Sequence, residues 1–328
     1  MKIDAFLVGI PVAFILALAS PHLGVGDGPL HMGRVIGIGV AVMFFLHGAA
    51  VSRESLKSAT AHWRLHLLVH TSTYVLFPTI GLTLFILMRR WLPEDLRLGF
   101  FYLCAVSSTV SSSVALTSLA KGNVAGAMFD ATLSGLLGMG LTPLLVELVT
   151  VASAAGAPFL REIVGVAVQL LAPFAAGQLL QPWLAALLQQ RKSLVRKVDQ
   201  CVILLIVYSA FCGAAVSNLW RRQNAIYIVE IFVLVTGLLA AALALTMWAA
   251  RVFGFSREDE IAAVFCGSKK SLVNGAPIAK VIFGASPALG MIMLPLLFYH
   301  PLQLVVCGVL ARRYAADTVS AKGKLCEI

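Results

Sequence analysis

Long apolar runs separated by short polar segments make up most of this chain. Ten of the runs have the length, roughly 20 residues, that lets a helix cross the ~30 Å hydrocarbon core of a bilayer. They lie at residues 5–20, 35–52, 65–88, 98–120, 124–151, 163–184, 198–216, 226–253, 258–283 and 289–312. The pattern predicts an all-α polytopic membrane protein with ten transmembrane helices, in which residues 1–328 form one integral membrane domain.

Helix-breaking residues lie at or beside the edges of these runs, where the chain has to leave the helix. Pro21, Pro93 and Gly254 are examples. The ninth run opens on Ser256-Arg-Glu-Asp259, which has the spacing of a capping box. In that motif the serine oxygen accepts a hydrogen bond from the amide three residues further on. We therefore expect a helix to begin at this point.

Composition supports the membrane interpretation, because 59% of the residues are hydrophobic and only 12% are charged. An average soluble domain has about 25% charged residues. If the N-terminus is cytoplasmic, fifteen Lys and Arg residues fall on the cytoplasmic side and eight on the other. Positive residues concentrate in cytoplasmic loops, so we expect both termini in the cytoplasm and the protein in the plasma membrane, the inner membrane in a bacterium.

The net charge of +10 is explained by those loops. Since no basic helix face with interleaved aromatic residues is present, the sequence does not predict nucleic-acid binding. The six cysteines show no metal-ligand spacing. Motifs of hydrolases, P-loop enzymes and dinucleotide-binding enzymes are absent from the sequence, so we do not expect an enzyme.

A weak internal repeat divides the chain near its middle, at approximately residues 1–155 and 156–328. A shift of 162 positions places Cys104 on Cys266 and Gly122 on Gly284. Each half contains five of the expected spans, and an odd number of spans makes two repeats inverted. Inverted repeats of this kind bring corresponding broken helices together at the bilayer midplane, where they form a substrate and ion site.

The fourth expected span contains a polar stretch that indicates a broken helix. Eight of the fifteen residues from Cys104 to Ser118 carry hydroxyl groups, and six of these fall between Ser107 and Ser113. Isolated serines usually serve helix packing in membranes, whereas such a dense run is a source of oxygen ligands. The candidate binding residues in this stretch are Ser111, Ser112, Ser113 and Thr117.

The ninth span carries two adjacent lysines, Lys269 and Lys270, about 18 Å along a helix that rises about 1.5 Å per residue. A charge at bilayer depth costs at least about 2.5–3.5 kcal/mol, so two of them require a reason. Gly267, Gly275 and Pro277 weaken the helix there. We expect one lysine to bind an anionic substrate and the other to pair with an acid or with backbone carbonyls. The alternative is a pair of structural lysines. The neighbouring candidates are Ser268, Ser271 and Asn274.

Asp130, on the fifth span near Thr132, is the acid we expect to pair with a lysine or to coordinate a cation. Single histidines inside membrane helices are usually hydrogen-bonded structure, and a proton relay is the alternative. His47 and His300 are the candidates for such a relay.

Two long motifs resemble the bile acid:sodium symporter superfamily, in its SBF-like branch. They are Phe265-Cys-Gly-Ser-Lys-Lys-Ser-Leu followed by Asn274-Gly-Ala-Pro, and Thr109-Val-Ser-Ser-Ser-Val-Ala-Leu-Thr-Ser-Leu-Ala-Lys-Gly-Asn123. The resemblance covers essentially the whole chain. It implies ten helices in two inverted five-helix repeats. Helices one, two, six and seven then form a panel, and the other six form a core in which broken helices four and nine cross. It also implies alternating access between panel and core.

The sodium sites of that superfamily carry over only partly. At the crossing of the fourth helix, the bile acid branch uses a Ser-Asn pair whose positions become Ser113 and Val114. The hydroxyl positions on the fifth helix become alanines next to Asp130 and Thr132. The resemblance therefore implies Na⁺ as coupling ion at Ser113, Asp130 and Thr132, with no other cofactor.

Ser268 takes the place of the glutamate that serves both sodium sites in the bile acid branch, and Lys269 and Lys270 follow it. A lysine ammonium there could occupy the position and charge of a bound sodium ion. We therefore expect weaker dependence on sodium than in the bile acid branch, with protons as the alternative coupling ion.

The predicted function is secondary active transport of an organic anion by alternating access, coupled to sodium or to protons. Bile acids or sterol conjugates are the substrate class that the resemblance implies. The expected partners are this small molecule and the lipid bilayer. The alternative is a membrane regulator or sensor that binds a ligand in the same site without significant flux.

Overall fold

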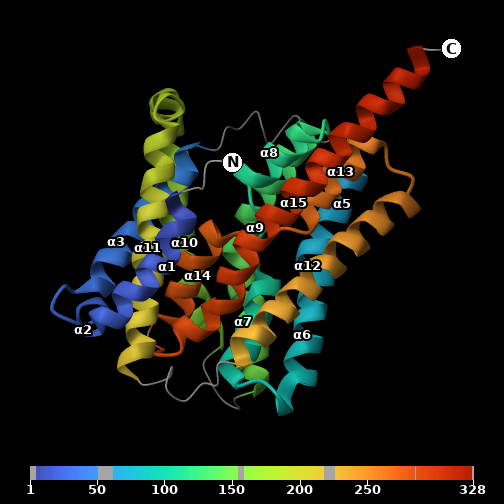
Figure 1. The fold of residues 1–328 in the computed structure, drawn as a ribbon. Helices are drawn as coiled ribbons and strands as arrows, with labels where there is room; N and C mark the ends of the chain where they lie inside the picture. Colours follow the sequence, from blue (N-terminus) through green and yellow to red (C-terminus); the bar gives the residue numbers. More distant parts are fainter. Residues whose placement is uncertain (1–4, 51–61, 154–158, 218–225, 285, 327–328) are drawn as a thin grey trace.

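A computed structural model describes residues 5–50, 62–153, 159–217, 226–284 and 286–326, and the regular structure within these ranges is entirely helical (Figure 1). The helices of the first half are α1 (Ala5–Ala19), α2 (Pro21–Gly24), α3 (Met32–Ala50), α5 (Trp63–Thr71), the π-helix η2 (Ser72–Leu76), α6 (Phe77–Leu87), the 3₁₀ helix η3 (Met88–Arg90), α7 (Glu94–Ala105), α8 (Ser111–Leu119) and α9 (Val124–Ser153). Those of the second half are α10 (Phe159–Gln190), α11 (Lys192–Val216), α12 (Ile226–Val252), α13 (Arg257–Gly267), α14 (Leu272–Phe283) and α15 (Leu289–Cys326).

Seven helices in the described ranges are long and apolar enough to cross a membrane, which confirms a multi-pass, all-helical membrane protein. The remaining three expected spans contain shorter helices. One is α1, with 15 residues. The other two are the polar spans at 98–120 and 258–283, and each of them is divided into two helices, α7 with α8 and α13 with α14. The total of ten spans and the inversion of the repeat remain predictions.

The helices gather in two groups. In Figure 1, α1, α2, α3, α10 and α11 lie on the left, and α5 to α9, α12, α13 and α15 lie on the right. Within the left group, α3 packs on α10 and α1 on α11, while α11 also contacts α14 and α15. α1 begins and α15 ends toward the same end of the bundle, the top of the view.

Glycines let α3 and α10 approach closely. A Cβ added at Gly48 of α3 would overlap the backbone of Phe174, and one added at Gly177 of α10 would overlap the backbone of Phe45. The Gln178 side-chain amide donates to the Gly48 carbonyl across the same contact. Inside a bilayer no hydrophobic force drives helices together. Close packing through small residues and interhelical hydrogen bonds holds them instead.

The divided span at 258–283 starts and restarts at serine caps. Ser256 caps α13 by accepting a hydrogen bond from the Asp259 amide over 3.2 Å, as the capping box predicts. Ser271 caps α14 by accepting from the Asn274 amide over 3.1 Å. Backbone at Val106 and Ser271 is extended, with φ −70° and ψ 148° at Val106 and φ −88° and ψ 113° at Ser271. The polar stretches of the sequence are therefore true interruptions.

Candidate functional site at the meeting of two interrupted helices

The two interruptions lie against each other and are hydrogen-bonded. The Ser271 backbone amide donates to the Ser107 carbonyl over 2.8 Å, and the Asn274 side-chain amide donates to the Ser107 hydroxyl over 3.1 Å. All three residues are buried. Two segments from opposite halves of the chain, with Ser107 and Asn274 separated by 167 positions, therefore meet.

A broken helix leaves the last carbonyls of its first half without donors from the same helix. At the end of α13 these carbonyls, and that of Ser268, accept hydrogen bonds from side chains of other segments. The pairs are Ser113 Oγ to Phe265 O (3.0 Å), Ser108 Oγ to Cys266 O (2.6 Å), Ser72 Oγ to Gly267 O (3.1 Å) and Tyr299 OH to Ser268 O (2.6 Å). The serine-rich run thus caps the partner helix with two of its hydroxyl groups.

Lys270 serves the other broken helix. Its side chain is fully buried, and its ammonium donates to the carbonyls of Cys104 (2.7 Å), Val106 (2.8 Å) and Thr73 (3.1 Å). The Phe77 ring lies beneath the ammonium, with its centroid 4.1 Å from Nζ. This lysine therefore pairs with backbone carbonyls, one of the two roles expected for the pair.

Lys269 differs from its neighbour. It is also fully buried, but its Nζ has no hydrogen-bond partner among the described residues. Cys266 and Cys307, both buried free thiols, are among the groups close enough to influence it. A buried amine without a partner is costly, because a polar group removed from water needs a hydrogen-bond partner.

A third segment, the π-helix η2, completes the meeting point. The Phe77 amide donates to the Ser72 carbonyl five residues back, which leaves the Thr73 carbonyl free for Lys270. The Tyr74 hydroxyl donates to the Ser134 carbonyl of α9, and the Ser134 hydroxyl accepts from the Ser108 amide over 3.0 Å. Single π-turns are frequent at functional sites. No motif in the sequence predicts this π-helix, although Pro78, which lacks an amide proton, indicates a weakened helix.

Asp130 lies with histidines instead of lysines. Its Oδ1 is 2.8 Å from His66 Nδ1 and 3.5 Å from His70 Nε2, and both imidazoles come from α5. The carboxylate is fully buried, and its Oδ2 has no hydrogen-bond partner in the described part of the chain. The expected ion pair with Lys269 or Lys270 is therefore not formed. The sequence does not reveal the contacts of Asp130 with His66 and His70, because these histidines lie 64 and 60 positions away and no local motif links them to Asp130.

The remaining predicted side chains divide between the interior and the surface. Ser113, Thr117 and Ser268 are buried, and the Thr117 hydroxyl has no hydrogen-bond partner among the described residues. Ser112 contacts the Thr109 hydroxyl at 2.7 Å. Ser111 is exposed and Thr132 is half-buried. Of Ser111, Ser112, Ser113 and Thr117, it is Ser113 that donates to the partner helix, at the Phe265 carbonyl.

The two histidines proposed as a relay lie in different places. His47 of α3 contacts the Asp199 carboxylate of α11, with Nε2 3.1 Å from each oxygen. His300 of α15 lies 3.1 Å, through Nδ1, from the Gln303 amide nitrogen. Gln303 in turn binds both the amide and the carbonyl of Lys270 at 2.8 Å. Only His300 is therefore connected to the meeting point by these hydrogen bonds.

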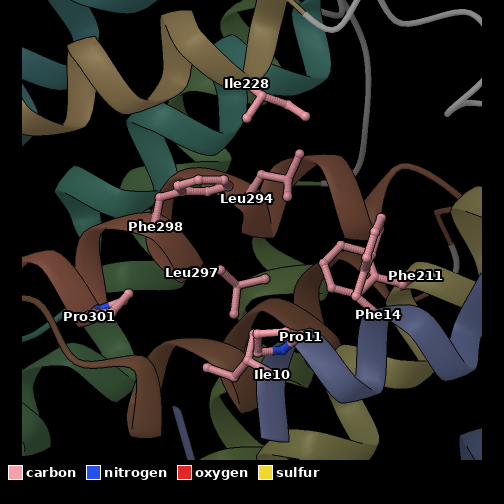
Figure 2. A pocket seen from close by; sticks show the side chains of 9 residues that line it. All are labelled: Ile10, Pro11, Phe14, Phe211, Ile228, Leu294, Leu297, Phe298 and Pro301. Carbon is pink, nitrogen blue, oxygen red and sulfur yellow. The ribbon is translucent and has the colours of Figure 1, made fainter. Parts of the chain in front are cut away.

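An apolar cavity of about 430 Å³ lies between α1 and α11 on one side and α12 and α15 on the other (Figure 2). Its lining consists of apolar side chains, namely Ile10, Pro11, Phe14, Phe211, Ile228, Leu294, Leu297, Phe298 and Pro301. The side chains point toward a common space in Figure 2. Phe298 and Pro301 flank Tyr299 and His300, so the cavity lies next to residues that hold the interruption of α13 and α14.

Interrupted helices that meet in the interior of an all-helical membrane protein are typical of transporters, in which broken helices form the substrate and ion sites. The chain belongs to the SBF-like CPA transporter family, whose model matches residues 4–316. This confirms the resemblance found in the two motifs. Membership of a transporter family also agrees with the absence of enzyme motifs in the sequence.

Relatives align along nearly the whole chain. It is 47% identical to Uncharacterized protein PA2026 of Pseudomonas aeruginosa, over 99% of this chain and 96% of that protein. It is 41% identical to Putative symporter YfeH of Escherichia coli, over 96% and 94% of the two chains. It is 33% identical to Sodium/bile acid cotransporter 7 of Danio rerio, over 93% and 91%.

Proposed function

We propose that this chain is a secondary active transporter of an organic anion that works by alternating access. The observation that carries the proposal is Lys269, a fully buried lysine whose ammonium has no hydrogen-bond partner among the described residues. It lies where two interrupted helices meet. An anionic group of a substrate would supply the missing partner, and the substrate would leave that site empty again on release.

The helix ends favour the same charge. The N-termini of α8 and α14 begin at Ser111 and Leu272, directly after the two interruptions. Helix N-termini carry unsatisfied amides and the positive end of the helix dipole, so they attract anions. Lysine and helix ends thus act together on a negative substrate group.

The apolar cavity supports a substrate with an apolar body. Its nine lining side chains are all apolar, and it lies between the two helix groups that alternating access would move against each other. Relatives named sodium/bile acid cotransporter 7 agree with an amphipathic anion such as a bile acid or sterol conjugate. Localisation in the plasma membrane, or a bacterial inner membrane, with cytoplasmic termini belongs to the same proposal.

The coupling ion is sodium or a proton. Sodium would use Asp130 with Ser113 and Thr132, as the resemblance implies. The Ser113 hydroxyl already donates to the Phe265 carbonyl, and the Asp130 carboxylate already contacts His66. Sodium binding would therefore require these contacts to rearrange. Proton coupling would use the imidazole and carboxylate groups already in contact.

Uptake into proteoliposomes tests the proposal against its alternative, a regulator that binds ligand without flux. The purified chain would be reconstituted and offered a radiolabelled bile-acid conjugate, a steroid sulfate and a short carboxylate under an inward sodium or proton gradient. We expect saturable, gradient-dependent accumulation of one of them. Saturable binding to the detergent-purified protein without accumulation in any gradient would identify the regulator instead.

A further inference from the structure

Lys270 occupies a site that is built like a cation site. The three carbonyl oxygens of Thr73, Cys104 and Val106 converge on one nitrogen at 2.7–3.1 Å. Carbonyls released from broken helices are the groups that coordinate alkali cations in transporters and in channel filters. The Phe77 face, 4.1 Å from Nζ, adds the attraction of an aromatic ring for a cation.

None of these carbonyls has its usual helical donor. The Phe77 amide, the α-helical partner of the Thr73 carbonyl, donates to Ser72 instead. The Ser108 amide, which would serve the Cys104 carbonyl in a continued helix, donates to the Ser134 hydroxyl. The Val106 carbonyl lies within the interruption itself. The site therefore exists because two helices depart from regular geometry at the same place.

The arrangement of the three carbonyls fits a charged ammonium. A protonated lysine has three N–H donors, and all three carbonyls lie within hydrogen-bonding distance. A neutral amine has only two such donors and would leave one buried carbonyl unpaired. The site also lies at the C-terminal end of α7, where the helix dipole favours positive charge.

We propose that Lys270 is a tethered cation that permanently occupies a monovalent-cation site, and that its removal opens this site to a free alkali or ammonium ion. As a statement about coupling, the inference rests on the proposed transport function. For coupling, it means that the Lys270 side chain takes the place of one coupling cation, which is then not taken from solution during transport. As a statement about cation binding it stands on the carbonyl geometry alone.

The test measures thermal unfolding of the full-length, detergent-purified protein in choline, sodium, potassium and ammonium chloride at equal ionic strength. In choline, Lys270→Ala should unfold at a lower temperature than wild type. A small cation should restore most of that loss, because an ion at about 100 times its Kd shifts the folding equilibrium about a hundredfold. The matched control is Lys269→Ala, whose ammonium has no carbonyl partners. It should gain no new cation response.

A folded Lys270→Ala protein whose cation response equals that of wild type would overturn the proposal. If Lys270→Ala does not fold, Lys270→Gln decides the matter, because its amide fills the space with neutral donors. We expect Lys270→Gln to unfold at a lower temperature than wild type in every salt, and equal midpoints would show that the charge is irrelevant. Uptake measurements address the coupling separately. Failure of wild-type uptake would count against the transport function and leave the cation result standing.

Discussion

Gln303 is the residue whose replacement gives the sharpest quantitative prediction. Its side-chain amide is fully buried, accepts from the Lys270 backbone amide and donates to the Lys270 carbonyl, each over 2.8 Å. Both backbone groups lie in the interruption between α13 and α14, so the helix itself cannot satisfy them. Gln303→Met keeps a side chain of similar size and removes both hydrogen bonds to Lys270, together with the contact of the amide with His300 Nδ1.

The magnitude follows from the two lost partners. Hydrogen bonds inside membrane proteins average about 0.6 kcal/mol, because the unfolded chain also finds partners, so two of them set a lower bound of about 1.2 kcal/mol. A buried polar group left unpaired costs about 1–3 kcal/mol. Two such groups set an upper bound of about 6 kcal/mol. Since both groups are backbone and lie in a fixed interruption, we expect a loss of about 2–4 kcal/mol.

The free energy of unfolding would be measured by reversible unfolding in mixed detergent and SDS micelles. Gln189→Met, at an exposed position near the end of α10, is the matched control and should change stability by less than about 0.5 kcal/mol. A Gln303→Met protein as stable as this control would refute the reasoning. It would mean that the Lys270 backbone has other partners in solution.

Three further changes test separate parts of the structure. Ser108→Ala leaves the Cys266 carbonyl without its donor and should lower stability by about 0.6–1.7 kcal/mol. The exposed Ser118→Ala should have no measurable effect. Gly177→Leu drives a side chain into the backbone of Phe45 and should cost about 1–3 kcal/mol or prevent folding, while Gly165→Leu on the same helix meets open space. A stable Gly177→Leu protein would contradict the close packing of α3 and α10. Asp130→Asn removes the charge that His66 and His70 face. Any sodium-specific rise in the unfolding midpoint should vanish with it, and a rise that persists would place the sodium site elsewhere.

The sequence predicts the interruptions well because their signals are local. Dense hydroxyl groups between Ser107 and Ser113 and adjacent charges at Lys269 and Lys270 conflict with a lipid-facing helix, so the chain has to break there. The capping box at Ser256 is local too, and it forms as expected. Of the two roles expected for the adjacent lysines, pairing with backbone carbonyls is the one that Lys270 shows.

The partners of the interruptions are not predictable in the same way. Gln303 and Tyr299 lie in an apolar span and Ser72 lies in the polar run His70-Thr-Ser-Thr-Tyr74, but nothing near these residues in the sequence shows that they face broken backbone. The π-helix at Ser72–Leu76 depends on which amide reaches which carbonyl, a choice decided by tertiary contacts. The pairing of Asp130 with His66 joins residues 64 positions apart. Without a local motif for this contact, the sequence favours Lys269 or Lys270 as the partner of Asp130.

The central claim is that an organic anion passes through the meeting point of the two interrupted helices. It is tested most directly by comparing uptake in proteoliposomes containing wild type, Lys269→Ala and Lys280→Ala. Lys280, near the end of α14, is half-buried with its ammonium 3.4 Å from the Gly284 carbonyl, and it is the matched lysine outside the site. We predict that Lys269→Ala abolishes accumulation of the transported anion while Lys280→Ala retains it. Unchanged uptake by a folded Lys269→Ala protein would contradict the claim.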